Sequence, residues 1–528
     1  MDRTAGRGQV SQQISGSRKL HLRKSYRVVP GQFLCVAFIS VILASFCVLL
    51  EPLAAAQSAS PQNSAPARQG TQHKPQSNPA PPSPEAKQPD RKISPQAAEE
   101  LFREIDEILK FASKDTALPI REPVKKRLVN RDEVVAFIQK HMMEDKDAQR
   151  LERSALILKK WGLLPRDFEL QPFLLRLLRE QVEGYYDPET KTVNMLDWVE
   201  PEQQHPVMAH ELTHALQDQS FDLEKYMKAG DIDLATMNND PTPDDIVNDE
   251  AGSAHQAVVE GQAMVVSIDY ELAAVHQSVA DSPEIVQALK NTMIQGTSDS
   301  VEFRSAPLYI KEALTFPYRY GLDFEAELLT RYGQEKAYAG VFQKPPRTTR
   351  EIMEPAAYLS GEKLEPMTLP DFKSDFKNYD KFDVGAVGEF DVAILIEQYE
   401  GNEIAKRLYP HWRGGYYYAV RPKSDPKAPL GLLYVSRWSN PERASEFASV
   451  YVKGLKQRYK QLDVVGDPAT RGSPSSYTLN TVTGKHSWTT EEGVVLLEVV
   501  GDTVLVCESL DSQTTDRLER ELLPGGSK

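Results

Sequence analysis

The spacing of apolar residues divides the chain into a largely helical first half and a mixed second half. Apolar residues recur at helical intervals over residues 98–109, 131–143 and 147–160. We therefore predict that residues 93–180 are mainly helical. Residues 184–196 show a different pattern, in which β-forming residues flank an Asp-Pro-Glu-Thr turn at 187–190. This pattern predicts a β-hairpin.

A further helix is predicted directly after the hairpin. Pro206 suits a first helical turn, where its missing N–H costs nothing. An apolar stripe at helical spacing follows, made of Met208, Leu212, Ala215 and Leu216. Three polar residues, His210, Glu211 and His214, lie off this stripe. We expect the helix to pack through its apolar side and to present these polar residues to a cleft.

Beyond about residue 361 the pattern predicts an α+β domain with an antiparallel sheet. Helices are expected at 388–399 and from Pro441 to about Leu455, where Ser439 and Asn440 precede the helix start. The expected strands lie at 416–420, 430–436, near Tyr477, near Ser487, at 494–500 and at 503–507. The predicted domains are 93–360 and 361–528, and no role is assigned to the second.

The N-terminus has the features of an export signal. Residues 1–32 contain seven Lys or Arg against one Asp, residues 33–50 are apolar or small, and Ala54-Ala55-Ala56 offers a cleavage site. The apolar run of 18 residues is also just long enough to span a bilayer as an uncleaved anchor. We expect everything after residue 57 to be exported, to the periplasm or beyond the cell. Residues 57–92, rich in Pro, Ser and Gln, are expected to form a disordered linker.

Cysteine usage and charge narrow the classes of partner. Cys35 and Cys47 lie in the apolar signal, so Cys507 remains alone, in a predicted buried strand, and no internal disulfide is expected. The chain has a net charge of −14, and residues 93–528 carry −22. This charge argues against nucleic acid or an anionic membrane surface as partner. Contact with a membrane is expected only through an uncleaved N-terminal anchor.

The sequence His210-Glu211-Leu212-Thr213-His214 carries the candidate chemistry. Residues four apart on a helix project about 40° from one another, so the two imidazoles can bind one metal ion. Glu211 lies beside them, where a general base for a metal-activated water belongs. A zinc hydrolase needs a third protein ligand.

Glu260 is the best candidate for that third ligand, because it lies within an apolar run, residues 257–266, that predicts a buried helix. Asp249, Glu250 and His255 are weaker rivals in polar surroundings. Gly261 is expected to let two helices approach closely. The acidic segment 231–250 is predicted to be a solvated loop rather than a calcium site, since it lacks EF-hand spacing.

These motifs resemble the gluzincins, the zinc peptidases with two His ligands and one Glu ligand. The helix with His-Glu-Leu-Thr-His resembles that of thermolysin-type enzymes, and Glu-Gly-x-Ala at Glu260 resembles the ligand segment of M1-type aminopeptidases. The resemblance spans about residues 180–265. It implies a zincin-like fold, zinc held by His210, His214 and Glu260, and water activation by Glu211. It also implies that the hairpin provides a sheet edge beside the metal helix, to which a peptide substrate adds as a strand.

The chain departs from these families in several ways. Val259 replaces the aminopeptidase Asn, and the interval from His214 to Glu260 is longer than in either family. No Asp follows Glu260 by four residues, as it does in thermolysin-type enzymes. Asp218, four residues after His214, is the candidate for orienting that imidazole.

Residues 315–321 could supply a donor for charge that develops in the transition state. Tyr318 is the first choice and Tyr320 the second, while aromatic packing at a turn is the structural alternative. Similar Phe-Pro-Tyr segments and Pro-Pro-x-Thr-Thr segments (here 345–349) occur in uncharacterised bacterial proteins with HExxH. This likeness favours one domain that extends to about residue 360.

The sequence thus predicts an exported zinc metallopeptidase of gluzincin type that hydrolyses a peptide or protein substrate. One alternative is a non-catalytic protein of zincin fold that binds peptides or a partner in the cell envelope. Another is a metal-free helical protein in which the motif is accidental. The oligomeric state is not predicted.

Overall fold

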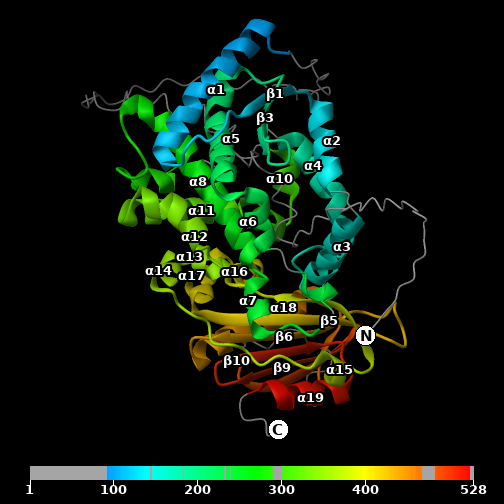
Figure 1. The fold of residues 1–528 in the computed structure, drawn as a ribbon. Coiled ribbons are helices and arrows are strands. Elements are labelled where there is room, and N and C mark those ends of the chain that lie inside the picture. The colour runs from blue at the N-terminus through cyan, green and yellow to red at the C-terminus, as the bar shows by residue number, and fades with distance from the viewer. Residues whose placement is uncertain are drawn as a thin grey trace, which may run out of the picture.

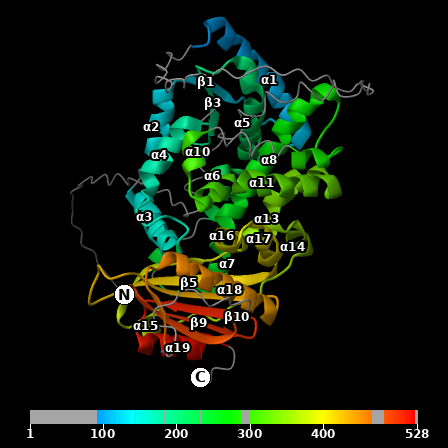
Figure 2. The ribbon, with the colours of Figure 1, turned by 180° about the vertical axis from the view of Figure 1, so that it is seen from behind.

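The protein has a mixed α+β fold, in which a helical part with a small sheet lies over a larger antiparallel sheet (Figures 1 and 2). The computed structural model describes residues 92–142, 145–181, 184–230, 233–237, 239–288, 300–465 and 482–523. The predicted signal, nearly all of the predicted linker and the strand expected near Tyr477 lie outside these residues. No helix in the described part of the chain is both long and apolar enough to cross a membrane.

The N-terminal helices follow the apolar spacing of the sequence. Helices α1 (Pro95–Thr116), α2 (Arg131–Met142) and α3 (Asp145–Lys160) confirm the three predicted helices, and α4 (Leu170–Gln181) extends the series. A strand, β1 (Lys125–Val129), was not predicted. Its sequence Lys-Lys-Arg-Leu-Val is short and mostly charged, so it lacks the alternation that marks a strand.

The predicted hairpin is confirmed as β2 (Gly184–Asp187) and β3 (Thr192–Leu196), an antiparallel pair. Strand β1 pairs with β3 in parallel, which gives a three-stranded sheet of order β1-β3-β2. Strand β2 is therefore an edge strand, and it packs against the helix that follows the hairpin.

That helix, α5 (Pro201–Phe221), begins earlier than predicted. The expectation that Pro206 lies in its first turn is wrong, because Pro201 occupies the start and Pro206 lies inside the helix. The added turn carries the buried Gln204. Its side-chain amide accepts from Leu196 N (3.1 Å) and donates to Val199 O (2.7 Å), which fixes the turn to the hairpin.

The segment between α5 and the next long helix is more ordered than predicted. Helices α6 (Leu223–Ala229) and α7 (Pro243–Asn248) lie in it, and Thr242 caps α7 through a capping box with Asp245. The expectation of a solvated loop over 231–250 is therefore wrong at its C-terminal end. Its last residue, Glu250, is buried.

Two long helices complete the helical part, α8 (Ala251–Leu272) and α11 (Leu308–Tyr332). Helix α8 confirms the predicted buried helix around Glu260. Residues 315–321 lie within α11 with Pro317 inside the helix, so the structural alternative of aromatic packing at a turn is wrong about the turn. The short elements around these helices are α10 (Val301–Ser305), α12 (Val341–Gln343), α13 (Thr349–Met353), α14 (Pro355–Ser360), and η2 (Leu234–Thr236), η3 (Ala273–Val275) and η4 (Lys336–Gly340).

Helices α8 and α11 touch through glycines, as expected for Gly261. A Cβ added at Gly261 would lie 2.3 Å from the carbonyl oxygen of Gly321. A Cβ at Gly321 would lie 2.2 Å from the carbonyl oxygen of Ala257. Backbone meets backbone here, so neither position has room for a side chain.

Gly261→Ala should destabilise the fold despite the better helix propensity of Ala. The methyl group forces α8 and α11 apart, and overpacking of this kind typically costs about 1–3 kcal/mol. Urea denaturation followed by circular dichroism measures the loss. Gly340→Ala is the milder comparison, because its Cβ would lie 3.2 Å from Glu335 O, which needs a shift of only a few tenths of an ångström. Equal stability of Gly261→Ala and the wild type would contradict the close approach.

The C-terminal part is built on a seven-stranded antiparallel sheet of order β4-β5-β6-β10-β9-β8-β7. It confirms the antiparallel sheet predicted from the sequence and, where residues are described, the helices and strands expected after 361. The strands are β4 (Tyr379–Ala386), β5 (Trp412–Pro422), β6 (Gly431–Trp438), β7 (Leu462–Val464), β8 (Gly484–Thr490), β9 (Gly493–Val500) and β10 (Thr503–Glu508).

Helices cover both faces of this sheet. On the face toward the helical part lie α16 (Glu389–Glu400) and α18 (Pro441–Arg458), followed by α17 (Asn402–Leu408) and η5 (Tyr409–His411). On the far face lie α15 (Phe372–Asp375) and α19 (Ser512–Leu522) (Figure 1). Alternation along β10 separates Val506, in the core shared with the helical part, from Cys507, in the far core. Cys507 is a buried strand residue, as predicted.

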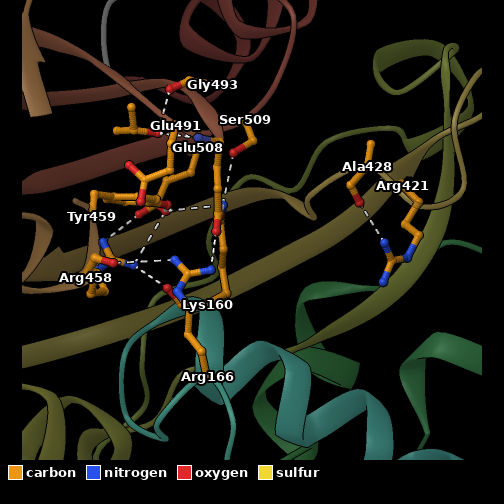
Figure 3. A network of polar contacts seen from close by, with 12 residues as sticks. Lys160, Arg166, Arg421, Ala428, Arg458, Tyr459, Glu491, Gly493, Glu508 and Ser509 are labelled. Carbon is orange, nitrogen blue, oxygen red and sulfur yellow. Dashed lines mark hydrogen bonds and ion pairs between the residues drawn. The ribbon is translucent and has the colours of Figure 1, made fainter. Parts of the chain in front are cut away.

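A buried charge network joins the end of α3 to this sheet (Figure 3). Glu508 on β10 accepts from Arg458 Nη2 (2.7 Å) and from Tyr459 OH (2.5 Å). Lys160 Nζ donates to Ser509 Oγ at 3.0 Å. Burial alone would raise the pKa of Glu508, but Arg458 and Lys160 hold it below its usual value. The network therefore ties the two parts of the molecule together by paired charges.

Candidate metal centre

Helix α5 carries three of the candidate site residues on its buried middle turns. Glu200 precedes the helix and Pro201 occupies its first position. At the other end Asp222 adopts a left-handed conformation (φ 57°), and its side chain accepts from Lys225 N to start α6. Helix α5 is thus fixed at both ends, and its centre packs against α8.

The structure brings His210, His214 and Glu260 together. One potential ligand atom from each of the three lies within 4.8 Å of the others. Glu260 Oε2 is 3.1 Å from His210 Nε2 and 3.5 Å from His214 Nε2. Two imidazoles and one carboxylate are a ligand set that suits zinc.

The rival ligands lie elsewhere. Asp249 accepts from the backbone N–H of Ala386 at 2.9 Å, and Glu250 accepts from the Thr349 hydroxyl. His255 bonds through Nδ1 to Tyr226 O at 3.1 Å. Among the described residues, His210, His214 and Glu260 form the only cluster with metal-ligand spacing.

Glu211 is held by the edge strand. Its Oε2 accepts from the backbone N–H of Tyr186 on β2 at 2.6 Å. This bond fixes the carboxylate beside the His-Glu cluster, and it uses one of the outward N–H groups of the strand. The Tyr186 hydroxyl donates to Asp218 at 2.6 Å, which anchors the same strand to α5 a second time.

Asp218 does not orient His214, so that expectation is wrong. Asp218 accepts from Tyr186 OH and from Lys191 Nζ (2.5 Å). The partner of His214 Nδ1 is instead Gln217 Oε1, at 2.9 Å. The residue three positions after His214 reaches its ring, while Asp218 points toward the hairpin.

The amide of Gln217 determines which nitrogen of His214 carries the proton in its neutral form. Gln217 Nε2 donates to Val259 O (3.1 Å) and to Gln262 Oε1 (2.9 Å), so its Oε1 must accept. Gln262 Nε2 in turn donates to the backbone oxygens of Ala337 and Tyr338. Neutral His214 is therefore protonated on Nδ1, which leaves the lone pair of Nε2 directed toward Glu260.

Gln217→Leu should weaken zinc binding by about 10–100-fold, the usual effect of losing a partner of a metal-bound imidazole. Leucine keeps the size of the side chain but leaves His214 Nδ1 without its acceptor. Competition with a fluorescent zinc chelator measures the dissociation constant. Gln203→Leu, at an exposed position of α5, is the control. Unchanged affinity in Gln217→Leu would contradict the role given to this amide.

Tyr318 and Tyr320 occupy different surroundings. The Tyr318 ring lies 6.4 Å from the His210 ring, with 27° between their planes. The Tyr320 ring packs instead against Phe316 (5.4 Å) and Phe390 (6.4 Å). Of the two candidates, Tyr318 is therefore the one beside the cluster.

The cluster is deeply buried, and the expectation that α5 presents it to a cleft is wrong for this conformation. His210 and Glu211 are 0 % exposed and Glu260 is 2 % exposed. Every residue of α5 from Pro206 to Asp218 is buried, since β2, α1 and α8 all pack against this helix. A substrate would therefore need movement of a neighbouring element.

Burial and mutual charge set the protonation of the metal-free cluster. Burial alone would lower the pKa of His214, but the Glu260 carboxylate raises it to about 9. Burial alone would raise the pKa of Glu260, but His214 lowers it to about 2. Burial lowers the pKa of His210. The metal-free cluster at neutral pH is thus a His214–Glu260 ion pair beside a neutral His210.

A comparison of the chain with known protein families, curated proteins and solved structures found no match. The site therefore has to be judged on its own geometry. Sequence reasoning missed Gln217 and Gln262. A signal for Gln217 was present, because residues three apart on a helix are neighbours and this one follows His214.

Proposed function

We propose that this protein is an exported zinc-dependent metallopeptidase with a zincin-like domain at residues 93–360. His210, His214 and Glu260 would hold zinc, Glu211 would be the general base and Tyr318 a hydrogen-bond donor to the reacting carbonyl. The observation that carries the proposal is the convergence of the three buried ligand groups within 4.8 Å, with Glu211 next to His210 in the chain. Export to the periplasm or the cell exterior stays a prediction from the N-terminal sequence.

Two features of the cluster support a metal rather than a purely structural contact. His214 Nε2 is buried and makes no hydrogen bond among the described residues, and its contact with Glu260 Oε2, at 3.5 Å, is an ion pair only. When His214 is neutral, its Nδ1–H···Oε1 bond to Gln217 leaves the Nε2 lone pair free to bind a metal. In the metal-free cluster the proton on His214 compensates the buried Glu260 carboxylate, and zinc would take over that role when His214 gives up its proton.

Each residue of the proposed site would have a separate role in hydrolysis. A bound zinc ion would polarise the peptide carbonyl and acidify a water molecule. Glu211 would take a proton from the attacking water as its oxygen bonds to the carbonyl carbon. The same carboxylate would pass that proton to the leaving nitrogen as the C–N bond breaks. The Tyr186 N–H keeps Glu211 in place, and the Tyr318 hydroxyl would stabilise charge on the carbonyl oxygen.

The burial of the site favours one second candidate, a non-catalytic protein of the same fold that binds peptides or an envelope partner. In that case zinc would only stabilise the packing of α5 on α8. Turnover separates the two functions, since only a peptidase releases new amino termini.

Cleavage of a peptide library, followed by mass spectrometry, tests the proposed function. We expect hydrolysis that stops when a chelator removes zinc and returns when zinc is added back. Zinc binding without any cleavage, across blocked and unblocked peptides, would favour the non-catalytic candidate.

Zinc binding should release one proton per protein near neutral pH. His214, with a pKa of about 9, must lose its proton to become a ligand, while Glu260 is already ionised. The apparent affinity for zinc should therefore rise about tenfold per pH unit up to pH about 9. Calorimetry in buffers of different ionisation enthalpy measures the proton count. An affinity that is constant between pH 6 and pH 8 would contradict this protonation state.

A further inference from the structure

A cavity lies between the helical part and the seven-stranded sheet. It encloses about 140 Å³ and is lined by residues of α3, α8, α11, α16 and β5. Cavities of this size admit a benzene-sized molecule. Its apolar walls include Trp161, Phe316 and Phe390, so the cavity suits a small ligand with an apolar body.

Three carboxylates line this cavity, of which Glu250 is buried and Asp249 and Asp391 are half-buried. Asp249 and Glu250 directly precede α8, and Asp391 lies in the first turn of α16. No Lys, Arg or His is among the described residues that line it. Arg150 on α3, which lies outside the lining, acts on Asp249 as a compensating charge.

Hydrogen bonds fix these carboxylates without neutralising them. Asp249 accepts from Ala386 N (2.9 Å), Asp391 accepts from Gly388 N (3.0 Å), and Glu250 accepts from Thr349. Burial raises the pKa of Asp249 to about 7, of Glu250 to about 8 and of Asp391 to about 6. A cation inside the cavity would stabilise their charged forms.

Two further polar groups of the cavity wall are unpaired. Gln256 is 3 % exposed, and its Oε1 has no hydrogen-bond partner among the described residues. Trp161 is 6 % exposed, and its indole Nε1 likewise has none. Unpaired buried groups of this kind are costly. Gln256 Oε1 could accept from an N–H donor of a ligand, and the Trp161 Nε1–H group could donate to an acceptor.

The cavity lies close to the proposed metal site. Gln256 precedes Glu260 by four residues on α8, which is about one helical turn or 6 Å along the axis. Pro317, which lines the cavity, directly precedes Tyr318, whose ring lies beside His210. The cavity and the proposed metal site are therefore neighbours along α8 and α11, although His210, Glu211, His214, Glu260 and Tyr318 do not line the cavity.

We infer that this cavity binds a primary ammonium group on a short apolar body, with Gln256 Oε1 as one acceptor of its three N–H groups and the carboxylates of Asp249, Glu250 and Asp391 supplying the others. The ammonium group belongs to the peptide substrate, as its amino terminus or as a lysine side chain. The identification of the ammonium group as part of a peptide substrate rests on the proposed function. The binding of an amine in the cavity does not. The cavity would then determine which bond of the substrate reaches Glu211.

Small probes test the inference on the full chain. The probes are n-butylammonium, L-leucinamide as an amino-terminal mimic, Nα-acetyl-L-lysine amide as a side-chain mimic, and n-butanol as the uncharged control. Calorimetry and tryptophan fluorescence measure binding. We expect n-butylammonium and one or both mimics to bind at least tenfold more tightly than n-butanol. The tighter mimic identifies the source of the ammonium group. Equal affinity for butanol and butylammonium, or no binding of any ammonium probe, would overturn the inference.

Gln256→Leu is the test variant and Gln203→Leu its control. Leucine removes an acceptor that pairs with no described residue, so the fold should survive. Glu250→Gln is not a suitable test, because it would disturb the close contact between Glu250 and Gly388. We expect Gln256→Leu to lower affinity for the ammonium probes at least tenfold while zinc content stays unchanged. Unchanged amine affinity in this variant would count against the site.

Amine binding in a protein that cleaves no peptide would refute the proposed function alone, and cleavage without amine binding would refute this inference alone.

Discussion

Glu260→Ala should lose more than about 100-fold in zinc affinity, because it leaves two ligands where a zinc site needs three. The carboxylate lies 3.1 Å from His210 Nε2 and 3.5 Å from His214 Nε2, so no other described side chain can replace it without rearrangement. Zinc content after dialysis against a weak chelator, measured by mass spectrometry, gives the result directly.

Two further variants make this experiment specific. Glu260→Gln retains the shape of the side chain and should also lose zinc, which separates loss of charge from loss of packing. His255→Asn removes a rival ligand and should retain zinc, because its imidazole bonds to Tyr226 O instead. Full zinc content in Glu260→Ala and Glu260→Gln would refute the assignment of the third ligand.

Glu211→Gln should keep zinc and lose about 10²–10⁴-fold in the rate of peptide hydrolysis, the usual contribution of a general base. The amide oxygen of glutamine can still accept from Tyr186 N–H, so the packing at β2 should persist. The amide cannot take the proton from water. Steady-state hydrolysis of the best library peptide measures the effect, with zinc content determined on the same sample.

Glu202→Gln is the matched control for this variant, since it makes the same change at an exposed position of α5. It should retain full activity. Wild-type turnover in Glu211→Gln would remove the general base from the mechanism, even if the metal site were intact. Loss of zinc in Glu211→Gln would show instead that this carboxylate is a ligand.

The elements of the fold could be predicted where a regular apolar period marks them. Helices α1, α2 and α3, the hairpin and most strands of the C-terminal sheet follow such periods. Strand β1 could not be predicted, because its pairing with β3 is parallel and joins segments far apart in the chain. The start of α5 was misplaced because Pro201 and Pro206 both satisfy the same local rule. The contact of Gln204 with the hairpin decides between them.

The residues of the candidate site, too, could be predicted where a local pattern in the sequence marks them. His210, His214 and Glu211 have a fixed spacing on one helix, and Glu260 is a carboxylate in an apolar run. Gln217 acquires its role only when α8 and the backbone near Tyr338 are placed around it. The burial of the cluster also depends on packing, because β2, α1 and α8 cover α5 together. Long-range contacts of this kind leave no periodic trace in the sequence.

The most direct test of the central claim is an anomalous difference map, recorded at the zinc absorption edge, from crystals of the zinc-loaded protein. We predict a single strong peak within bonding distance of His210 Nε2, His214 Nε2 and a carboxylate oxygen of Glu260, about 2.0–2.2 Å from each. A peak at another group of side chains, or crystals that hold no zinc at any position, would contradict it.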